Sequence, residues 1–590
     1  MVKACPGPFQ ASVAQSARPR WPLIATALLL AATIYGFSGR LLPWNVSASA
    51  PFSFPDAWVD KDTKMCPQAK PLAPQRNSVL WENITALHSS DTFLKRAIAQ
   101  LSNAVQIPTE TFDSMGPVGE DARWESRGPF VDHLEKAFPL VHSTLKLERV
   151  NTYGLLYIWE GSVSSLKPLL LMGHYDVVPV AASSVDQWTH PPYSGHYDGE
   201  NIWGRGSSDD KSGVIGMMTA IEVLLEHNFT PTRTVILSFG FDEELADQRY
   251  GARHLASTLL ERLGPDSIAM IVDEGSGYSE NYGAIFAVPG IAEKGSANVE
   301  VEVKTPGGHS SVPPKHTSIG ILAAIIVHLE LNAPKPELAV DTPLFEMAQC
   351  FAAHGPGMPR DVKRSIRRAA RRGSAKHLKK AAEYLLQDTM LKALVGTTLA
   401  VDIVNGGVKS NALPEQAMVG ITASMNIRPH YSQTVVNHLN ATLSRDSSLV
   451  MDLAEKYNLS VTAYGEPLTP ADTPTYGSVL IHAPIHLEPA PISPIDANPF
   501  QILAGSIRTA RQTGSTKDDV YVAPGMMTGN TDTKYYWPLS KHIFRYGHRN
   551  MIGRGMGGIH TVNEHVPAAS FVEIITYLTV LILNVDETTL

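Results

Sequence analysis

Cysteine is scarce in this chain of 590 residues. There are three cysteines, Cys5, Cys66 and Cys350, too few for a disulfide framework or for a zinc site built from thiolates. Cys66 and Cys350 can form one bridge at most, and two unpaired thiols fit the sequence equally well. Any bound metal must therefore be held by histidine, aspartate and glutamate.

The sequence also lacks an excess of basic charge. Its net charge is −8, and 44% hydrophobic and 18% charged residues are ordinary values for a folded protein. This balance gives no reason to expect nucleic acid as a partner. The length exceeds what one compact core accommodates, so two or more globular units are expected.

One long apolar run lies near the N-terminus, at residues 23–42. It is about long enough to span a bilayer, and the basic residues before it predict a cytosolic tail at 1–22 and a lumenal remainder. A cleaved signal peptide is the alternative, with Ala48-Ser49-Ala50 as its processing site. That site lies thirteen residues beyond Phe37 and is followed by Pro51, so a transmembrane signal anchor is favoured.

Two further features concern the route and the ends of the chain. Residues 43–76 are rich in Pro, Ser and Lys and predict a stalk. Five N-x-[ST] sequons agree with a secretory route and glycosylation; they are Asn45, Asn83, Asn228, Asn440 and Asn458. The C-terminal run Phe571–Asn584 is short for a membrane span, and we expect it to be a core helix that closes the fold.

Residues 77–295 alternate strand-like and helix-like patterns, which is typical of an α/β fold with a mostly parallel sheet. Strands are expected at Leu155–Gly161, Pro168–Val180, Thr234–Glu244 and Ser267–Gly275, and a helix at Gly213–His227. In such sheets, sites form at the carboxyl ends of the strands. Residues 487–590 are expected to complete this catalytic domain.

The pattern changes at Ser296, where Ala297–Thr305 alternates strictly and a later strand is expected at Gln416–Arg428. We predict an inserted α+β lid domain of the dimerisation type at 296–486. It carries a basic helical insert at 360–390, with ten Lys or Arg residues between Arg360 and Lys380. A nucleic-acid patch is one interpretation; a solvated helix pair on the insert fits the acidic whole better.

Histidine and carboxylate residues, which can bind metal ions and are called metal-type residues below, follow several of the predicted strands. Such side chains are costly at buried strand ends unless a positive charge pairs with them, so a divalent cation explains their number. Taken singly, each also fits a helix cap, a satisfied core histidine or an exposed loop carboxylate. The set comprises His174, Asp176, Asp209, Glu243, Glu244, Asp273 and the distant His560.

Spacing suggests roles for two pairs. His174 and Asp176 lie on the same side of a strand end, since side chains alternate every residue; the histidine can bind metal while the aspartate orients its imidazole. Glu243 and Glu244 point in different directions. One can therefore bind metal while the other faces an attacking water as general base.

Together these motifs resemble the dizinc aminoacylase/carboxypeptidase metallopeptidase family, and within it the fungal vacuolar carboxypeptidase S (Gly-Xaa carboxypeptidase) branch. The matching runs are LLLMGHYDVVPV, WTHPPYSGHYDGENIWGRGSSDDKSG, DEE, TPGGHSSVPPKHTSIG, GGVKSNALPE, GNTDTKYYW and GIHTVNEH. They extend from Leu169 to His565. The resemblance implies a split catalytic domain with an inserted lid, two zinc ions per subunit and a lumenal, vacuolar location.

The resemblance also implies residue roles. One zinc would bind His174, Asp209 and Asp273, and the other Asp209, Glu244 and His560. Glu243 would be the general base and Asp176 the partner of His174. His309 on the lid would polarise the scissile carbonyl, often in a partner subunit's site. The substrate's carboxylate end would contact Asn411, Arg428, Thr528 and Gly529. One departure, Asp247 in a longer loop after Glu244, weakens the inference of substrate preference.

The expected function is therefore a zinc-dependent metallocarboxypeptidase that removes C-terminal residues from short peptides of the Gly-Xaa type. An N-acyl amino acid hydrolase shares the chemistry and is the alternative. An inactive membrane-anchored binding protein is disfavoured because all the ligands and the base are present. The expected partners are peptides with a free C-terminus and a membrane, without nucleic acid, and a homodimer is left open.

Overall fold

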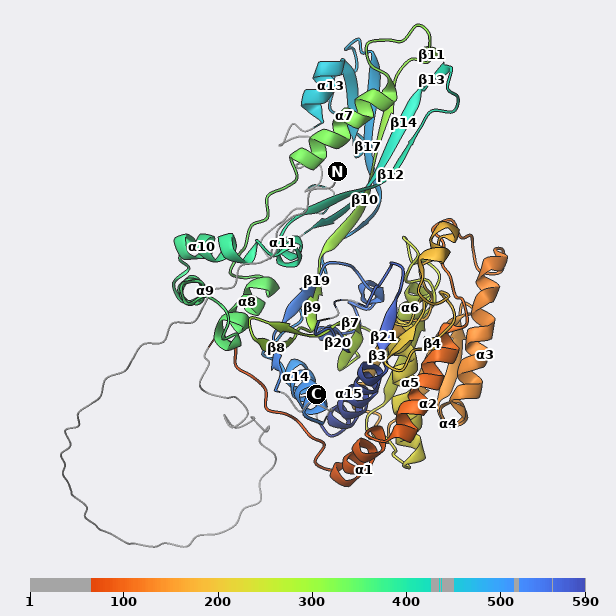
Figure 1. Ribbon diagram of the computed structural model, residues 1–590, viewed down its shortest axis with the longest axis vertical. Helices are drawn as coiled ribbons and strands as arrows, with labels where there is room; N and C mark the ends of the chain where they lie inside the picture. Colours follow the sequence, from red (N-terminus) through yellow and green to blue (C-terminus); the bar gives the residue numbers. More distant parts are fainter. Residues whose placement is uncertain are drawn as a thin grey trace, which may run out of the picture. The chain divides into compact units, whose positions relative to one another are not determined.

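The computed structural model describes residues 65–425, 435, 437, 450–513, 519–553, 555, 557–588 and 590. The predicted tail and anchor, most of the stalk, and Arg428 lie outside these residues. Figure 1 shows a larger domain built on one mixed sheet and an inserted domain built on a second sheet. The α/β fold class with an inserted lid is confirmed.

The larger sheet has the strand order β1-β2-β6-β3-β7-β20-β9-β19. Its four central neighbours, β6, β3, β7 and β20, are parallel, whereas β1, β2 and β8 pair antiparallel toward the margins. The strands are β1 Lys146–Val150, β2 Gly154–Trp159, β3 Leu169–His174, β6 Val235–Gly240, β7 Met270–Asn281, β8 Ala284–Ala287, β9 Gly290–Glu293, β18 Tyr521–Val522, β19 Gly525–Met527 and β20 Ile543–Asn550.

Alternate residues of the central strands pack on opposite faces, because side chains in a strand point alternately up and down. Leu169 and Leu171 join the core under α5, α14 and α15, whereas Leu170 and Met172 join the core under α6. The strands are buried on both faces, which explains their continuous apolar sequence. The helices are α1 Ser78–His88, α2 Asp91–Val105, α3 Gly128–Ala137, α4 Pro139–Thr144, α5 Lys211–Glu226, α6 Ala252–Leu263, α14 Asn498–Thr513 and α15 Ala568–Asp586.

Short elements complete this domain. Three small strands form a separate sheet in the order β21-β5-β4. These elements are η2 Ala122–Arg127, η3 Ala182–Gln187, β4 His196–Tyr197, β5 Asn201–Trp203, η5 Asp532–Tyr535 and β21 His565–Pro567.

Helix α15 is the only helix in the described chain that is long and apolar enough to cross a membrane, and 83% of its most apolar stretch is buried inside the protein. It packs against α5 and α14 in the main core. It is therefore a core helix, as the short apolar run at 571–584 predicted.

The inserted domain has a six-stranded sheet in the order β12-β14-β10-β17-β15-β16. The inward residues of β10, Ala297, Val299, Val301 and Val303, pack beneath α7 and α13. The elements are β10 Gly295–Lys304, β11 Gly308–His309, α7 Ser318–Leu331, β12 Thr398–Gly406, β13 Ala412–Leu413, β14 Gln416–Met425, α13 Met451–Tyr457, β15 Leu459–Ala463, β16 Glu466–Pro467 and β17 Gly477–Leu487.

The structure corrects the expected place of the basic insert. Helices α8 (Pro343–His354), α9 (Arg360–Arg372), α10 (Ala375–Leu385) and α11 (Thr389–Val395) share a core with β8 and with the segment around β19. Phe286 and Met526 of the large domain lie in that core. The helix pair thus packs on the margin of the catalytic sheet and does not project from the lid, because α9 has an apolar side that needs cover.

The predicted stalk is also too long at its C-terminal end. Cys66 forms a disulfide with Cys350 on α8. The Gln68 side chain donates to the Val522 carbonyl (3.0 Å) and accepts from the Val522 amide (2.7 Å), and the Leu72 amide donates to the Gly505 carbonyl. Residues 65–76 are therefore part of the folded domain, since paired backbone and a buried disulfide fix them to it.

Candidate metal centre

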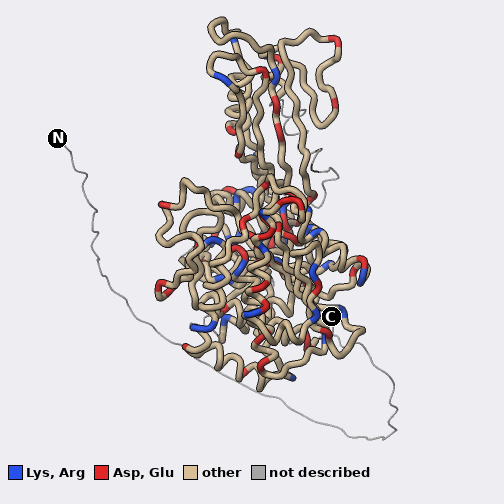
Figure 2. The backbone as a smooth tube through the Cα atoms, turned by 90° about the vertical axis from the view of Figure 1, so that its right-hand side faces the viewer, with Lys and Arg blue, Asp and Glu red and all other residues tan. Residues whose placement is uncertain are grey.

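Imidazole and carboxylate groups meet at the carboxyl ends of β3 and β6 and beside the first half of β7. His174 ends β3, Glu243 and Glu244 follow β6, and Glu274 lies on β7. Asp209 lies two residues before the first residue of α5. Figure 2 shows acidic residues gathered at one end of the larger domain. The fold thus brings together residues that are up to several hundred positions apart in the sequence.

Asp209 lies between two imidazoles. Its Oδ1 is 3.3 Å from Nε2 of His174, and its Oδ2 is 3.1 Å from Nε2 of His560. Glu274 Oε1 lies 3.2 Å from the same His174 nitrogen, and Glu244 Oε1 lies 3.2 Å from the same His560 nitrogen. Two groups of three potential ligands therefore share Asp209.

Glu274 takes the place that the sequence assigned to Asp273. Adjacent residues of β7 point to opposite sides of the strand, and it is Glu274 that reaches His174 and Asp209. Asp273 is buried and its Oδ2 lacks a hydrogen-bond partner within the described part of the chain. The DE dipeptide contained both residues, but the sequence does not show which of them faces the site.

Asp176 holds several of these groups in place. Its carboxylate lies 3.4 Å from Nδ1 of His174, accepts from the Thr111 hydroxyl (2.8 Å), and accepts from the backbone amides of Glu243 (3.0 Å) and Glu244 (3.1 Å). Burial raises the pKa of Asp176, but His174, Arg127 and Thr111 outweigh it and hold the pKa below its ordinary value. A charged Asp176 therefore fixes both the imidazole and the glutamate loop.

Burial and crowding raise the pKa values of the two glutamates that follow β6. Burial raises the pKa of Glu243 against the attraction of His174, and repulsion from Glu244 and Glu274 adds to the rise. Burial, together with the charge on Asp209, raises the pKa of Glu244 to about 7 despite its hydrogen bond with His560. A raised pKa suits a general base near neutral pH, and so many buried carboxylates call for positive charge nearby.

Neighbouring carboxylates raise the pKa values of the two histidines. Burial lowers the pKa of His174, but Glu274, Asp176 and Asp209 outweigh burial and hold it well above its ordinary value. Hydrogen bonds with Asp209 and then Glu244 raise the pKa of His560 to about 10. Each imidazole nitrogen thus faces a strongly negative site, where a cation can replace the proton.

A buried ion pair that the sequence analysis missed supports the Asp209 loop. Arg205 Nη1 donates to Glu564 Oε2 at 2.5 Å, and Glu564 Oε1 accepts from the amides of Ser208 (2.9 Å) and Asp209 (3.1 Å). Glu564 lies four residues after His560. The pair therefore links the two loops that carry Asp209 and His560, and the NEH and GRG motifs were its only signal.

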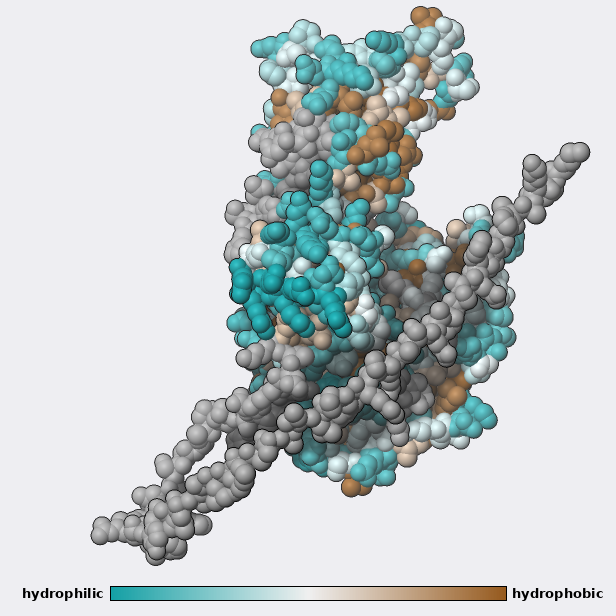
Figure 3. Space-filling model, turned by 60° about the vertical axis from the view of Figure 1, so that its left-hand side comes forward, coloured by the Kyte–Doolittle hydropathy of each residue, from teal (hydrophilic) through white to brown (hydrophobic). Residues whose placement is uncertain are grey.

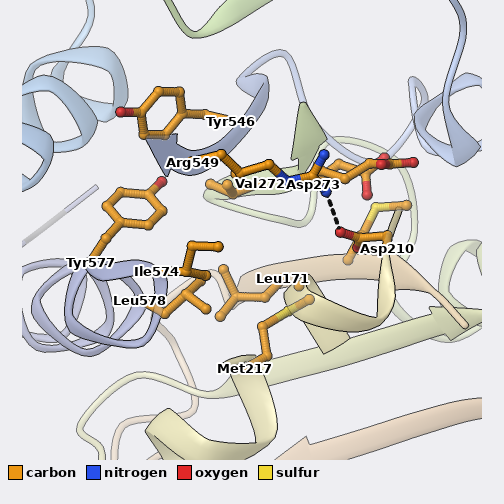
Figure 4. Close-up of a pocket in the computed structure, with 14 residues that line it drawn as sticks. Leu171, Asp210, Met217, Val272, Asp273, Tyr546, Arg549, Ile574, Tyr577 and Leu578 are labelled. Carbon is orange, nitrogen blue, oxygen red and sulfur yellow. Dashed lines mark hydrogen bonds and ion pairs between the residues drawn. The ribbon is translucent and has the colours of Figure 1, made fainter. Parts of the chain in front are cut away.

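A second missed pair lies behind the metal-type residues. Arg549, at the end of β20, donates through Nη2 to Oδ1 of Asp210 at 2.8 Å (Figure 4). The Asp210 carboxylate fits closely against Gly173 and Gly213, where a Cβ would lie within 2.7 Å of its oxygens. Burial lowers the pKa of Arg549, but Asp210, Asp209 and Glu274 outweigh burial and hold the pKa above its ordinary value, so the guanidinium stays charged beside the site.

The expected substrate residues lie outside this cluster. His309 on β11 and Asn411 before β13 are exposed on the lid, and the His309 Nδ1 accepts from the Ser311 amide at 3.1 Å. Thr528 and Gly529 follow β19 in the large domain. No hydrogen bond in the described structure joins these four residues to the metal-type cluster, and Arg428 is not described, so their roles stay predictions.

The donor set fits divalent metal. In each group of three, the ligand atoms lie within 4.8 Å of one another and comprise one imidazole nitrogen and two carboxylate oxygens. Zinc binds such nitrogen and oxygen donors at about 2.0–2.2 Å, so donor atoms 3.1–3.3 Å apart are compatible with a shared ion. Fold and site together define a metal-dependent hydrolase in which a lid is inserted into an α/β catalytic domain.

Comparison with known proteins gives the family. Residues 170–584 match the model of Peptidase family M20/M25/M40. Carboxypeptidase S of Saccharomyces cerevisiae is 40% identical over 88% of this chain and 89% of its own length. The mouse N-fatty-acyl-amino acid synthase/hydrolase PM20D1 is 32% identical over 82% of this chain and 87% of its own length. The chain belongs to the M20 metallopeptidase family.

Solved structures agree on the fold. Human carnosine dipeptidase 1 matches with a TM-score of 0.57 at 14% identity, covering 88% of this chain and 100% of that one. The di-peptidase Dug1p of Saccharomyces cerevisiae matches with a TM-score of 0.55 at 14% identity, covering 85% and 99%. At this identity the likeness supports the fold alone. The family resemblance and the peptidase class expected from the motifs are confirmed.

Proposed function

We propose that this chain is a dizinc metallocarboxypeptidase that releases C-terminal residues from short peptides of the Gly-Xaa type. The observation that carries the proposal is the shared position of Asp209 between the His174–Glu274 and His560–Glu244 groups. The 40% identity to carboxypeptidase S favours a peptide substrate. The proposed ligands are thus His174, Asp209 and Glu274 for one ion, and Asp209, Glu244 and His560 for the other.

The residues of the chain divide the chemistry among them. Bound zinc would lower the pKa of the attacking water and polarise the scissile carbonyl. Glu243 takes the proton of that water and returns it to the leaving amine, which its raised pKa permits. Asp176 fixes the Glu243 amide through its carboxylate, and it fixes the His174 ring through its backbone carbonyl, 3.0 Å from Nδ1. His309 would donate to the carbonyl oxygen as negative charge develops there.

Recognition of the substrate's carboxylate is assigned to Arg428, with Asn411, Thr528 and Gly529. A guanidinium binds a carboxylate through two parallel, charge-assisted hydrogen bonds, which positions the scissile bond. The test compares a Gly-Xaa dipeptide with the same peptide amidated at its C-terminus. We expect strong discrimination against the amide, and loss of it in Arg428→Ala with metal content unchanged. Equal cleavage of both peptides by the wild-type enzyme would contradict the carboxypeptidase assignment.

An N-acyl amino acid hydrolase is the second candidate. The specific observation in its favour is the 32% identity to an enzyme named N-fatty-acyl-amino acid synthase/hydrolase, which is lower than the identity to carboxypeptidase S. A panel of blocked dipeptides and N-acyl amino acids separates the two. Higher kcat/KM for acyl substrates would replace the peptidase assignment.

The cellular setting is part of the proposal. Residues 23–42 would anchor the chain in a membrane with the enzyme in the lumen, and we assign that lumen to the vacuole. The Cys66–Cys350 disulfide supports an oxidising compartment. The sequon residues Asn83, Asn228 and Asn458 are exposed, as glycan acceptors must be. Retention of the full-length protein in membranes through alkaline carbonate washing tests the anchor.

A homodimer through the lid is proposed as well. Strand β12 forms the edge of the lid sheet, and Ile403 and Val404 on it are 54% and 59% exposed. An open apolar edge strand invites pairing with a second copy. Sedimentation analysis tests this assignment, with Val404→Lys expected to shift the protein to monomer.

A further inference from the structure

Helices α9 and α10 form a strongly basic surface, on which Asp361 and Glu383 are the exposed acidic residues. The inner side of the pair, including Val362, Ile366, Ala369 and Leu385, is buried in the core shared with α8 and β8. The outer side forms the hydrophilic surface at mid-height in Figure 3. This basic surface consists of the exposed residues Arg360, Arg364, Arg367, Arg368, Arg371, Arg372, Lys376, Lys379 and Lys380.

The basic surface is almost uncompensated. Within the described chain, one ion pair forms on it, between Lys380 and Asp361 at 2.9 Å. Cations three and four positions apart on α9, such as Arg364, Arg367 and Arg371, repel one another and destabilise the helix. A helix that only needs solubility carries charges of alternating sign. The repulsion therefore points to an anionic partner that relieves it.

A disulfide connects the region of this surface to the part of the chain that follows the predicted anchor. Cys350 on α8, the helix before α9, is disulfide-bonded to Cys66, and His354 Nε2 lies 2.9 Å from the Cys66 carbonyl oxygen. Residues 43–65 separate Cys66 from the apolar run. Twenty-three residues span at most about 80 Å, so an anchored chain keeps Cys66, and the helix α8 bonded to it, within that reach of the bilayer.

The chemistry of the surface distinguishes among anionic partners. Its exposed residues include no aromatic side chain that could stack on bases, as single-stranded nucleic acid binders use. None of the large exposed apolar residues in the described chain lies on α9 or α10, so it lacks the apolar anchors of a protein interface. Its apolar side is already buried, which excludes insertion as an amphipathic helix.

We propose that the basic surface of α9 and α10 docks the catalytic domain electrostatically on an anionic lipid bilayer. Many spread cations without a pocket suit mobile anionic headgroups, each of which neutralises a Lys or Arg near the surface. The tether raises the effective concentration of the bilayer, so the contact can be weak and salt-sensitive. The proposal rests on the membrane anchor proposed above, and it is independent of the peptidase chemistry.

The test uses the full-length chain in vesicles of phosphatidylcholine alone or of phosphatidylcholine with phosphatidylserine. Amine labelling of Lys376 and Lys379 is followed by mass spectrometry, with the exposed Lys541 as an internal control. We expect labelling of the first two to slow at least about 3-fold on anionic vesicles only, and to recover near 1 M salt, where the Debye length is about 3 Å. Equal labelling on both vesicles overturns the proposal.

Two variants sharpen the result. Arg364→Glu with Arg367→Glu and Arg371→Glu should abolish the protection, whereas Lys95→Glu with Lys136→Glu and Arg253→Glu, exposed elsewhere, should retain it. Equal loss in both variants overturns the proposal. Protection by a soluble oligonucleotide but not by anionic vesicles would do the same. Dipeptide hydrolysis by each variant, measured in detergent, reports separately on the proposed function.

If carbonate washing removes the chain, the anchor assignment fails. Co-sedimentation of the released protein with the two vesicle types then tests the basic surface directly. Binding confined to anionic vesicles upholds docking without a tether, and absence of binding overturns it.

Discussion

Arg549 and Asp210 form an ion pair at 2.8 Å behind the metal-type cluster, with side chains only 12% and 2% exposed. Asp210 is the neighbour of Asp209, and Arg549 is also attracted by Asp209 and Glu274. One guanidinium thus influences both carboxylates that approach Nε2 of His174. Its position makes it a positioning residue that acts through Asp210 on the proposed ligands.

Breaking this pair should cost more than a surface pair. Arg549→Met leaves the Asp210 carboxylate buried and uncompensated, which typically destabilises a protein by about 3–5 kcal/mol. Denaturant unfolding of metal-free protein measures that loss, and competition with a zinc chelator should show weaker metal binding. Arg549→Lys should recover part of both. Unchanged stability and zinc affinity in Arg549→Met would show that the pair has no positioning role.

Two variants, Glu274→Gln and Asp273→Asn, show which of these two neighbours on β7 binds metal. Because Glu274 lies 3.2 Å from the His174 nitrogen, Glu274→Gln should lose about one zinc equivalent in metal analysis and most of its activity. Asp273→Asn should keep both ions. The reverse outcome would restore the assignment made from the sequence.

Glu243→Gln should keep its zinc and lose at least ~100-fold in kcat, the usual contribution of a general base. Glu244→Gln should instead reduce metal content, because Glu244 faces His560 in the second group. Parallel metal analysis and kinetics distinguish the two. Normal activity in Glu243→Gln would assign the base elsewhere.

Chelation should abolish hydrolysis, and added zinc should restore it. Removal of the ions leaves Glu243, Glu244 and Glu274 crowded and half-buried, so the metal-free protein should also unfold at a lower temperature. Thermal unfolding with and without zinc measures this shift independently of activity. Full activity in protein shown to be metal-free would exclude metal catalysis.

Two buried histidines outside the site predict a loss of stability in acid. Burial, with His227 and then Arg96 nearby, lowers the pKa of His88 to about 3, and burial, with Arg511, lowers that of His548 to about 3. The unfolded chain binds these protons near pH 6.5, so stability is complete above that value and falls between pH 6.5 and 3.

The expected loss at about pH 5 is ~2 kcal/mol for each histidine. His88→Gln should flatten the pH dependence of urea unfolding by about that amount, whereas His254→Gln, at an exposed position, should leave it unchanged. An identical acid response in all three proteins would show that His88 is protonated in the folded state.

The sequence predicted the parts of the site that local pattern determines. His174, Asp209, Glu244 and His560 follow apolar strands or lie in loops of distinctive composition, and parallel strands bring such ends together. The choice between Asp273 and Glu274 depends on the facing of one β-strand residue, which a DE dipeptide does not encode. Arg549 carried no local signal, because its partner Asp210 lies 339 positions away in the sequence.

The fold likewise has parts that the local sequence pattern determines and parts that depend on contacts between residues distant in the sequence. The alternation of apolar and polar residues in Ala297–Thr305 predicted β10 to within two residues at each end. It could do so because one face of the strand is buried and side chains alternate between the two faces. The helices at 360–390 were expected on the lid because they lie within its sequence range. Their position depends on contacts with Phe286 and Met526, which lie on strands distant in the sequence. The folded domain begins earlier than predicted because Cys66 is bonded to the distant Cys350. The local sequence pattern indicates neither contact.

The disulfide between Cys66 and Cys350 decides which proteolytic cuts can free the enzyme from its N-terminal segment. The two cysteines are 284 positions apart, and the bond encloses nearly all of the first catalytic segment. A chain nicked anywhere inside that span stays in one covalent piece and separates only under reducing conditions. Release of an intact enzyme therefore requires a cut upstream of Cys66, within residues 43–65 that follow the apolar run.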